Sequence, residues 1–93
     1  MPAAQADLRA AYAYYAERNP AAYAERNPAA DRVVGAILNA ANGLAQLPLM
    51  GRHGAVPGTR ERIVTRYPYR VVYHIVDDTI EVLRVIYTAQ QWP

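Results

Sequence analysis

Arginines recur through the last third of the chain, in stretches rich in Val, Ile and Tyr. Such stretches favour β-strands, so their guanidinium groups are expected at set positions on a sheet rather than on mobile loops. A guanidinium presents a planar fork of donors that matches phosphate and carboxylate oxygens. The pattern therefore indicates a surface for a phosphate backbone or an acidic partner. Between residues 51 and 76 a single acidic residue, Glu61, accompanies Arg52, Arg60, Arg62, Arg66 and Arg70.

Three strands are expected to position these arginines, over residues 60–67, 69–76 and 80–87. A proline separates the first two segments and an Asp-Asp pair separates the last two, so a three-stranded antiparallel meander is the simplest arrangement. The preceding segment, residues 47–59, has the glycine and proline content of a loop.

Two helices are expected ahead of the strands. Apolar and small residues recur at helical spacing from Ala3 to Arg18. Asn27 suits the N-cap and Pro28 the first position of a second helix, which should run to about Gln46. The element order predicts an α+β fold in which an N-terminal helical hairpin packs on one face of a small antiparallel sheet.

An octapeptide, Tyr-Ala-Glu-Arg-Asn-Pro-Ala-Ala, occurs twice in tandem over residues 15–22 and 23–30. Eight extra residues would rotate the apolar face of a continuous helix by about 80°. We therefore expect the prolines to place the repeat in a loop, as a slippage duplication without a role. A longer helical hairpin or a dimer contact is the alternative.

The composition excludes several classes of protein. With 93 residues, the chain is expected to form one domain over residues 1–93. It has no cysteine, and His53 and His74 lack the spacing of a zinc site, so neither a metal nor another cofactor is expected. No apolar run reaches the length of a membrane span, and a cytoplasmic location is expected. All ten basic residues are arginine, which fits phosphate recognition and equally fits a genomic codon bias.

Several segments together resemble the RelE/ParE superfamily of toxins from type II toxin–antitoxin systems. The resemblance covers nearly the whole chain. It implies a cytoplasmic toxin that inhibits growth and binds a cognate antitoxin. The segments are Ala4–Leu8, Ala29–Val33, Leu47–Pro48, Arg60–Glu61, Tyr69–Tyr73, Asp77–Glu81 and Thr88–Pro93.

Three features depart from that superfamily. Its members usually begin with a strand ahead of the first helix, whereas this sequence runs almost directly into helix, so we expect a sheet that is one strand short and open at one edge. An open edge favours a homodimer or the addition of an antitoxin strand. The duplicated octapeptide and Tyr87, where relatives often carry histidine, are the other departures.

The resemblance to ribosome-dependent mRNA interferases implies roles in cleavage at a phosphate. Arg70 would clamp the phosphate, or else form an ion pair with Asp77, Asp78 or Glu81. Glu61 would be a general base, although neighbouring arginines favour an ion pair instead. His74 would be catalytic, or packed or exposed on its strand. Tyr87 would replace the histidine as proton donor or stack on a base, or else lie in the core or at its rim.

Alternation along residues 60–67 places Arg60, Arg62 and Arg66 on one strand face, which we expect to point to solvent or to an RNA or antitoxin surface. Arg84 follows apolar neighbours on its strand, so we expect it to be paired or to lie at the mouth of a site. Trp92 either packs on the sheet or presents an aromatic ring to a partner.

Three functions remain open from the sequence. The leading one is a toxin that cleaves mRNA on the ribosome. The second is a ParE-like toxin that inhibits DNA gyrase by binding, without chemistry of its own. The third is an inactive module that retains only antitoxin binding.

Overall fold

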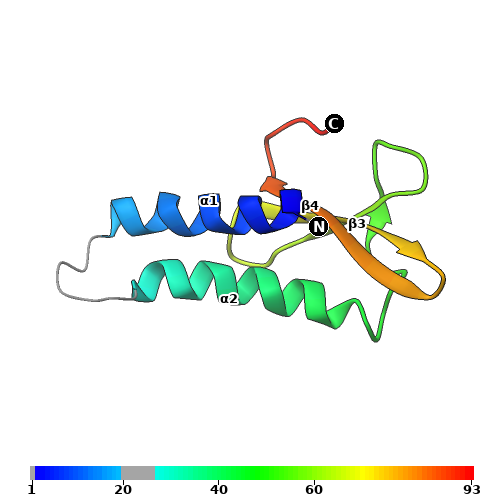
Figure 1. Ribbon diagram of the computed structural model, residues 1–93, viewed down its shortest axis with the longest axis horizontal. Coiled ribbons are helices and arrows are strands. Elements are labelled where there is room, and N and C mark those ends of the chain that lie inside the picture. Colours follow the sequence, from blue (N-terminus) through cyan, green and yellow to red (C-terminus); the bar gives the residue numbers. More distant parts are fainter. Residues whose placement is uncertain (1, 20–26) are drawn as a thin grey trace.

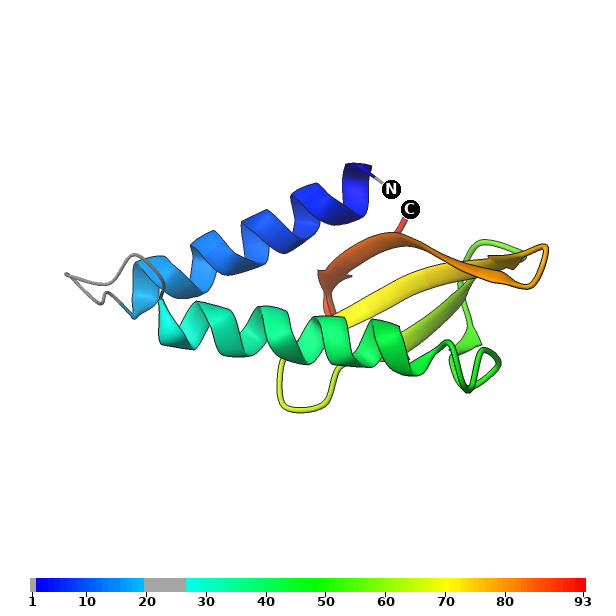
Figure 2. The same cartoon turned by 60° about the horizontal axis from the view of Figure 1, so that its bottom comes forward.

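The computed structural model describes residues 2–19 and 27–93. Two helices are followed by four strands, all antiparallel and in the sheet order β1-β2-β3-β4. Figure 1 shows the two helices side by side, and Figure 2 shows that they form one layer beside the sheet. The elements are α1 (Pro2–Arg18), α2 (Pro28–Gly43), β1 (Arg52–His53), β2 (Arg60–Ile63), β3 (Tyr69–Val76) and β4 (Thr79–Tyr87).

The helices begin close to where the sequence predicts them. The Asn27 side chain accepts hydrogen bonds from the backbone N–H groups of Ala29 and Ala30, and Pro28 is the first residue of α2. The predicted end near Gln46 is wrong, because α2 ends at Gly43 and a series of turns follows it. The tandem octapeptide lies partly outside the described residues.

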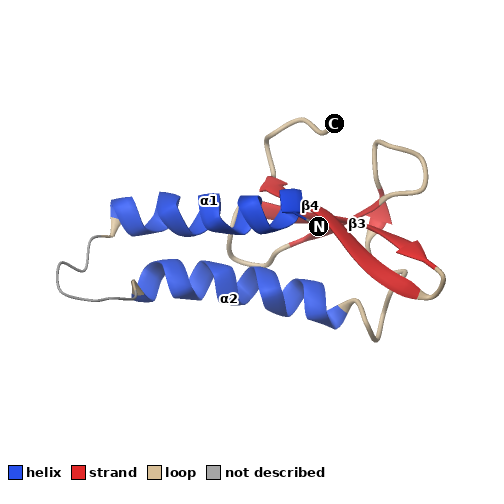
Figure 3. Ribbon diagram, in the orientation of Figure 1, coloured by secondary structure: helices blue, strands red, loops and turns tan. Residues whose placement is uncertain are grey.

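The sheet differs from the predicted three-stranded meander. A short fourth strand, β1, forms inside the segment predicted to be loop and pairs with the beginning of β2. The first predicted strand, residues 60–67, is also too long, since β2 ends at Ile63. The chain then turns through Arg66, whose φ is 78°, and the Val64 N–H donates to the Tyr69 carbonyl. The strands β1 to β4 form one sheet, and Figure 3 shows that it is twisted.

A tight hairpin joins β3 to β4. Asp77 and Asp78 have positive φ values of 50° and 63°, as the two central residues of a type I′ turn require. The Asp-Asp separation predicted from sequence is therefore confirmed as a two-residue turn. The pairing of β3 with β4 also contains a β-bulge, where the register shifts between Val72 and Tyr73.

The hydrophobic core lies between α2, α1 and one face of the sheet. Val71 and Tyr73 of β3 are fully buried against Val33 and Ile37 of α2. Helix α1 buries only the small Ala4 and Ala11, so it can approach β4 closely. We call the face of the sheet that carries Val71 and Tyr73 the inner face, and the opposite face the outer face.

No helix among the described residues is long and apolar enough to cross a membrane. Strand β4 is an outermost strand in the described part of the sheet. Its Val85 N–H donates to the Asp7 carboxylate of α1 at 2.8 Å. The first helix therefore covers part of the edge that the sequence predicts to be open.

Candidate functional site

An ion-paired cluster lies on the outer face of the sheet. The Arg70 Nη1 of β3 donates to the Glu61 Oε1 of β2 at 2.9 Å, and the Arg52 Nη2 of β1 lies 3.6 Å from the same oxygen. The Glu61 side chain is only 3% exposed. Arg70 therefore does not pair with Asp77, Asp78 or Glu81, the three carboxylates that the sequence suggested.

Arg70 also reaches beyond the sheet. Its Nη2 donates to the Gln90 backbone carbonyl. Its Nε is buried and has no hydrogen-bond partner among the described residues. The guanidinium thus bridges a buried carboxylate and a backbone oxygen, so neither of its Nη groups points freely at an external phosphate.

The solvent-facing arginine surface predicted along β2 is wrong. Arg60 lies opposite Tyr73 in the register and Arg62 lies opposite Val71, so both arginines are on the inner face. The Arg60 guanidinium donates to the Leu49 and Gly51 carbonyls, at 3.2 and 2.8 Å.

The other two arginines of the predicted surface are also separated. The Arg62 guanidinium donates to the Ala40 carbonyl in the last turn of α2, where a cation is favourable. Arg66 lies outside β2, in the exposed turn that follows it. The guanidinium groups of Arg60 and Arg62 therefore link the sheet to α2 and to the loop that follows it.

Arg84 is paired rather than exposed at the mouth of a site. Its Nε and Nη2 donate to the two carboxylate oxygens of Asp7, at 2.7 and 3.0 Å. This hydrogen bond raises the pKa of Arg84 above its usual value, against the opposing effect of burial. The pair ties the start of α1 to β4.

His74 of the outer face has its own partner. Its Nε2 lies 2.9 Å from the Glu81 Oε1 of β4. His74 is four residues from Arg70 along β3, a separation of about 13 Å in a strand. It therefore does not share a phosphate-sized site with the Arg70 guanidinium.

Tyr87 lies on the inner face within a cluster of tyrosines. Its ring stacks on Tyr69, with centroids 4.9 Å apart, and meets the Tyr14 ring edge-on at 5.7 Å. The pKa of Tyr87 is raised above its usual range, mainly by a hydrogen bond with Tyr14 and to a lesser extent by burial. The phenol is therefore a weaker acid than an exposed tyrosine, and a poor proton donor at neutral pH.

The predicted catalytic residues consequently do not converge. Arg70 and Glu61 share the outer face, whereas Tyr87 is opposite Tyr69 on the inner face, with the sheet between them. The sequence did not reveal the partners Asp7, Tyr14 and Gln90, which come from distant parts of the chain. Among residues 2–19 and 27–93 no three histidine or carboxylate side chains lie close enough together to hold a metal ion.

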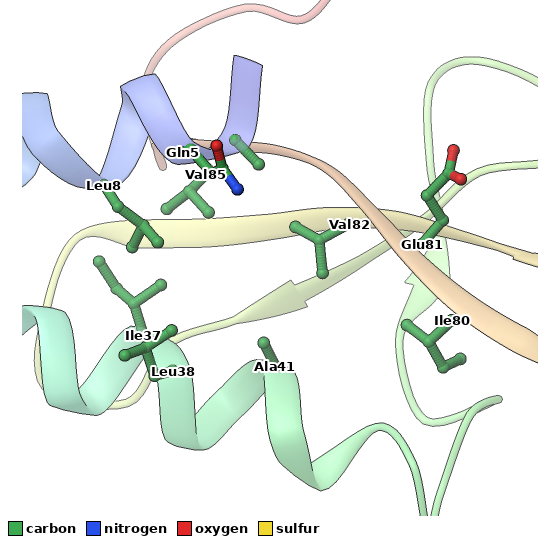
Figure 4. Close-up of a pocket in the computed structure, with 10 residues that line it drawn as sticks. Gln5, Leu8, Ile37, Leu38, Ala41, Ile80, Glu81, Val82 and Val85 are labelled. Atoms are coloured by element: carbon green, nitrogen blue, oxygen red, sulfur yellow. The ribbon is translucent and has the colours of Figure 1, made fainter. Parts of the chain in front are cut away.

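Several hollows border these residues, and two of them lie on opposite sides of the sheet. An apolar groove of about 290 Å³ lies between α1, α2 and β4 and is lined by Leu8, Ile37, Leu38, Val82 and Val85 among others, as Figure 4 shows. On the other side of the sheet, a more polar hollow of about 500 Å³ lies between Ala55, Arg70 and the segment Thr88–Pro93.

A helical hairpin packed on a small antiparallel sheet is the arrangement expected for the class of RelE/ParE toxins. Within that class, the profile described as the ParE toxin of the type II toxin–antitoxin system parDE matches residues 1–92. The chain belongs to this ParE toxin family.

The proteins similar to this chain include a curated toxin and a chain of a solved structure. The candidate toxin Y4kP of Sinorhizobium fredii is 42% identical over 64 residues, which make up 69% of this chain and 66%, just under two thirds, of that protein. A chain of the chromosomal ParDE toxin–antitoxin system from P. aeruginosa superimposes with a TM-score of 0.79 at 26% identity, over 94% of this chain and 89% of that chain. The predicted α+β fold and the RelE/ParE resemblance are confirmed.

Proposed function

We propose that this chain inhibits growth by binding DNA gyrase, without cleaving RNA, and that a cognate antitoxin neutralises it in the cytoplasm. The ParE family to which the chain belongs supports gyrase as the target, because the ParE branch of the superfamily is the branch that inhibits gyrase by binding. The RelE-like branch, by contrast, cleaves mRNA on the ribosome.

The observation that carries this proposal is the position of Glu61. A general base needs a carboxylate that can reach the proton it removes. Glu61 is 3% exposed and is held by Arg70 and Arg52, so it is poorly placed to accept a proton from RNA.

The remaining acid and base candidates support binding as well. Tyr87 lies on the opposite face of the sheet from Glu61, and His74 is engaged with Glu81. RNA cleavage by transfer within the backbone needs a base, an acid and a charge-neutralising group around one phosphate. The described side chains do not supply that set at one place.

The test compares the two target systems directly. Purified chain should block DNA supercoiling by gyrase and should leave mRNA intact in a cell-free translation reaction. The Glu61→Gln variant keeps an oxygen that can accept the hydrogen bond from Arg70 but cannot act as a general base, so it should retain gyrase inhibition.

Site-specific cuts in mRNA that disappear in Glu61→Gln, together with unimpaired supercoiling, would instead establish the interferase function. Failure in both reactions, with antitoxin binding retained, would leave the inactive antitoxin-binding module. The homodimer is a separate prediction, which light scattering measures.

A further inference from the structure

The segment Thr88–Pro93 leaves the end of β4 and lies apart from the helical layer, as Figure 1 shows. Residues 88–91 are exposed, and Trp92 is half-buried. Two backbone hydrogen bonds hold its beginning: the Thr88 N–H donates to the Pro68 carbonyl at 2.8 Å, and the Gln90 N–H donates to the Tyr87 carbonyl at 3.0 Å. Both bonds lie close to the end of β4, so they do not hold residues 91–93 in place.

Arg70 provides the bond that joins this segment to the outer face of the sheet. Its Nη2 donates to the Gln90 carbonyl while its Nη1 holds the buried Glu61 carboxylate. The Arg70 side chain is 12% exposed. Its bond to Glu61 is partly buried, whereas its bond to the Gln90 carbonyl is exposed to water. The buried Glu61 carboxylate thus holds the Arg70 guanidinium, and the guanidinium in turn holds the Gln90 carbonyl.

The unpaired Nε of Arg70 is informative. A guanidinium that binds a carboxylate through two parallel bonds satisfies more of its donors. Arg70 instead uses its two Nη groups on two separate acceptors and leaves the buried Nε without a partner among the described residues. An unsatisfied buried donor lowers stability. The guanidinium therefore gives up a second bond to the Glu61 carboxylate and uses its Nη2 group to hold the segment instead.

The attached segment borders a hollow in the surface. This hollow of about 500 Å³ is lined by Arg70, Ala55 and the segment Thr88–Pro93. Trp92 is the only tryptophan of the chain. Half-exposed tryptophan beside a hollow is typical of residues that contribute most to protein–protein binding.

We propose that Arg70 is a positioning residue that holds Thr88–Pro93 on the outer face, and that Trp92 and the adjoining hollow bind the target protein. This role rests on the proposed function, in which the toxin acts by binding gyrase. The guanidinium then acts on the target through the segment it holds and not by direct contact with a phosphate.

The test uses Trp92 as its own fluorescent probe, because no other tryptophan contributes to the signal. The Arg70→Lys variant keeps a positive charge beside Glu61, but a single ammonium cannot make the same bridge to Gln90. Its circular dichroism should match the unsubstituted chain. Quenching of Trp92 by acrylamide should increase about twofold, and the concentration needed to inhibit gyrase should rise about tenfold, equivalent to roughly 1.4 kcal/mol.

Two further variants separate the steps of the proposal. Arg52→Gln removes the other partner of Glu61 without touching the segment, and should leave both Trp92 quenching and gyrase inhibition unchanged. Trp92→Ala should keep the fold and lose inhibition to the same extent as Arg70→Lys.

Unchanged quenching in a folded Arg70→Lys variant would overturn the positioning role. Increased quenching with full inhibition, or full inhibition by Trp92→Ala, would overturn the assignment of the segment as the target surface. If the unsubstituted chain fails to inhibit gyrase while Arg70→Lys still releases Trp92 and loses growth inhibition in cells, the positioning role stands and gyrase is the wrong target.

Discussion

Asp7 of α1 binds Arg84 of β4 through both carboxylate oxygens, across 77 positions of sequence. One of these oxygens also accepts a hydrogen bond from the Val85 N–H, on the side of β4 that has no neighbouring strand in the described part of the chain. A single carboxylate therefore docks the first helix on the sheet and satisfies a donor that an edge strand would otherwise expose. The polar contact acts together with Leu8 and Tyr15 of α1, which are partly buried against the core.

We expect Asp7→Ala to lower the free energy of unfolding by about 2–3 kcal/mol, since it leaves both the Arg84 guanidinium and the Val85 N–H without their acceptor. The melting temperature should fall by about 10 °C or more. Denaturation followed by circular dichroism measures both quantities. Arg9→Ala, at an exposed position of the same helix, is the control and should change stability little. Equal effects of the two substitutions would show that the Asp7 contact adds nothing.

Substitution by alanine should have opposite effects on stability at Gly51 and at Gly35. A Cβ at Gly51 would lie 2.5 Å from the Tyr73 hydroxyl and 3.0 Å from the Glu61 carbonyl. Tyr73 is fully buried, and its hydroxyl is held between the Gly51 N–H and the Pro48 carbonyl, so it cannot move aside easily. Gly51→Ala should therefore destabilise the fold by about 3 kcal/mol.

Gly35 is exposed in the interior of α2, and a Cβ there meets no atom within 4 Å. Gly35→Ala should stabilise the fold by about 0.5–1 kcal/mol, because alanine loses less backbone entropy in a helix. Urea denaturation of the two variants gives the comparison. A Gly51→Ala variant as stable as the unsubstituted chain would contradict the close packing of Tyr73.

The N-cap of α2 can be tested without disturbing the core. Asn27→Ala removes the acceptor of the Ala29 and Ala30 N–H groups and should cost about 1–2 kcal/mol. Asn27→Ser restores a capping oxygen and should recover most of that loss. The measurement is the midpoint of thermal unfolding. Equal midpoints for the alanine and serine variants would mean that capping is not the origin of the effect.

The tyrosine cluster predicts loss of stability in alkaline solution. The pKa of Tyr87 is raised by its hydrogen bond with Tyr14 and by burial, and burial is the main cause that raises the pKa values of Tyr15 and Tyr69. Unfolded tyrosines lose their protons near pH 10, while the folded cluster keeps them, so the unfolded state binds fewer protons above about pH 10. The stabilisation from these phenols is complete below that pH and is lost as the pH rises above it.

The free energy of unfolding from urea titrations should accordingly be level between about pH 8 and 9 and fall above about pH 10. Tyr87→Phe has no phenol to ionise at that position, so its curve should fall less steeply. A curve for Tyr87→Phe that parallels that of the unsubstituted chain would exclude Tyr87 as a source of the alkaline transition.

Local signals in the sequence were sufficient to predict most of the helices, strands and turns. Asn27 followed by Pro28 marks the start of α2 because capping and a preset φ act within a few residues. The Asp77-Asp78 pair marks the β3–β4 turn for a similar reason, since its positive φ values suit these residues. The two-residue strand β1 was missed because its pairing with β2 depends on the loop between them, which carries no alternating pattern.

The sequence by itself determined the α+β order, the toxin superfamily, and which residues alternate along each strand. It did not determine which strand face meets the helices, because alternation defines two sets of residues and leaves their direction open. The register with Tyr73 and Val71 decided that Arg60 and Arg62 turn inward. Contacts across the fold likewise decided that Glu61 is buried with Arg70. Only the tertiary structure brings such distant residues together, and within it Arg70, His74 and Arg84 each have a carboxylate partner from another element.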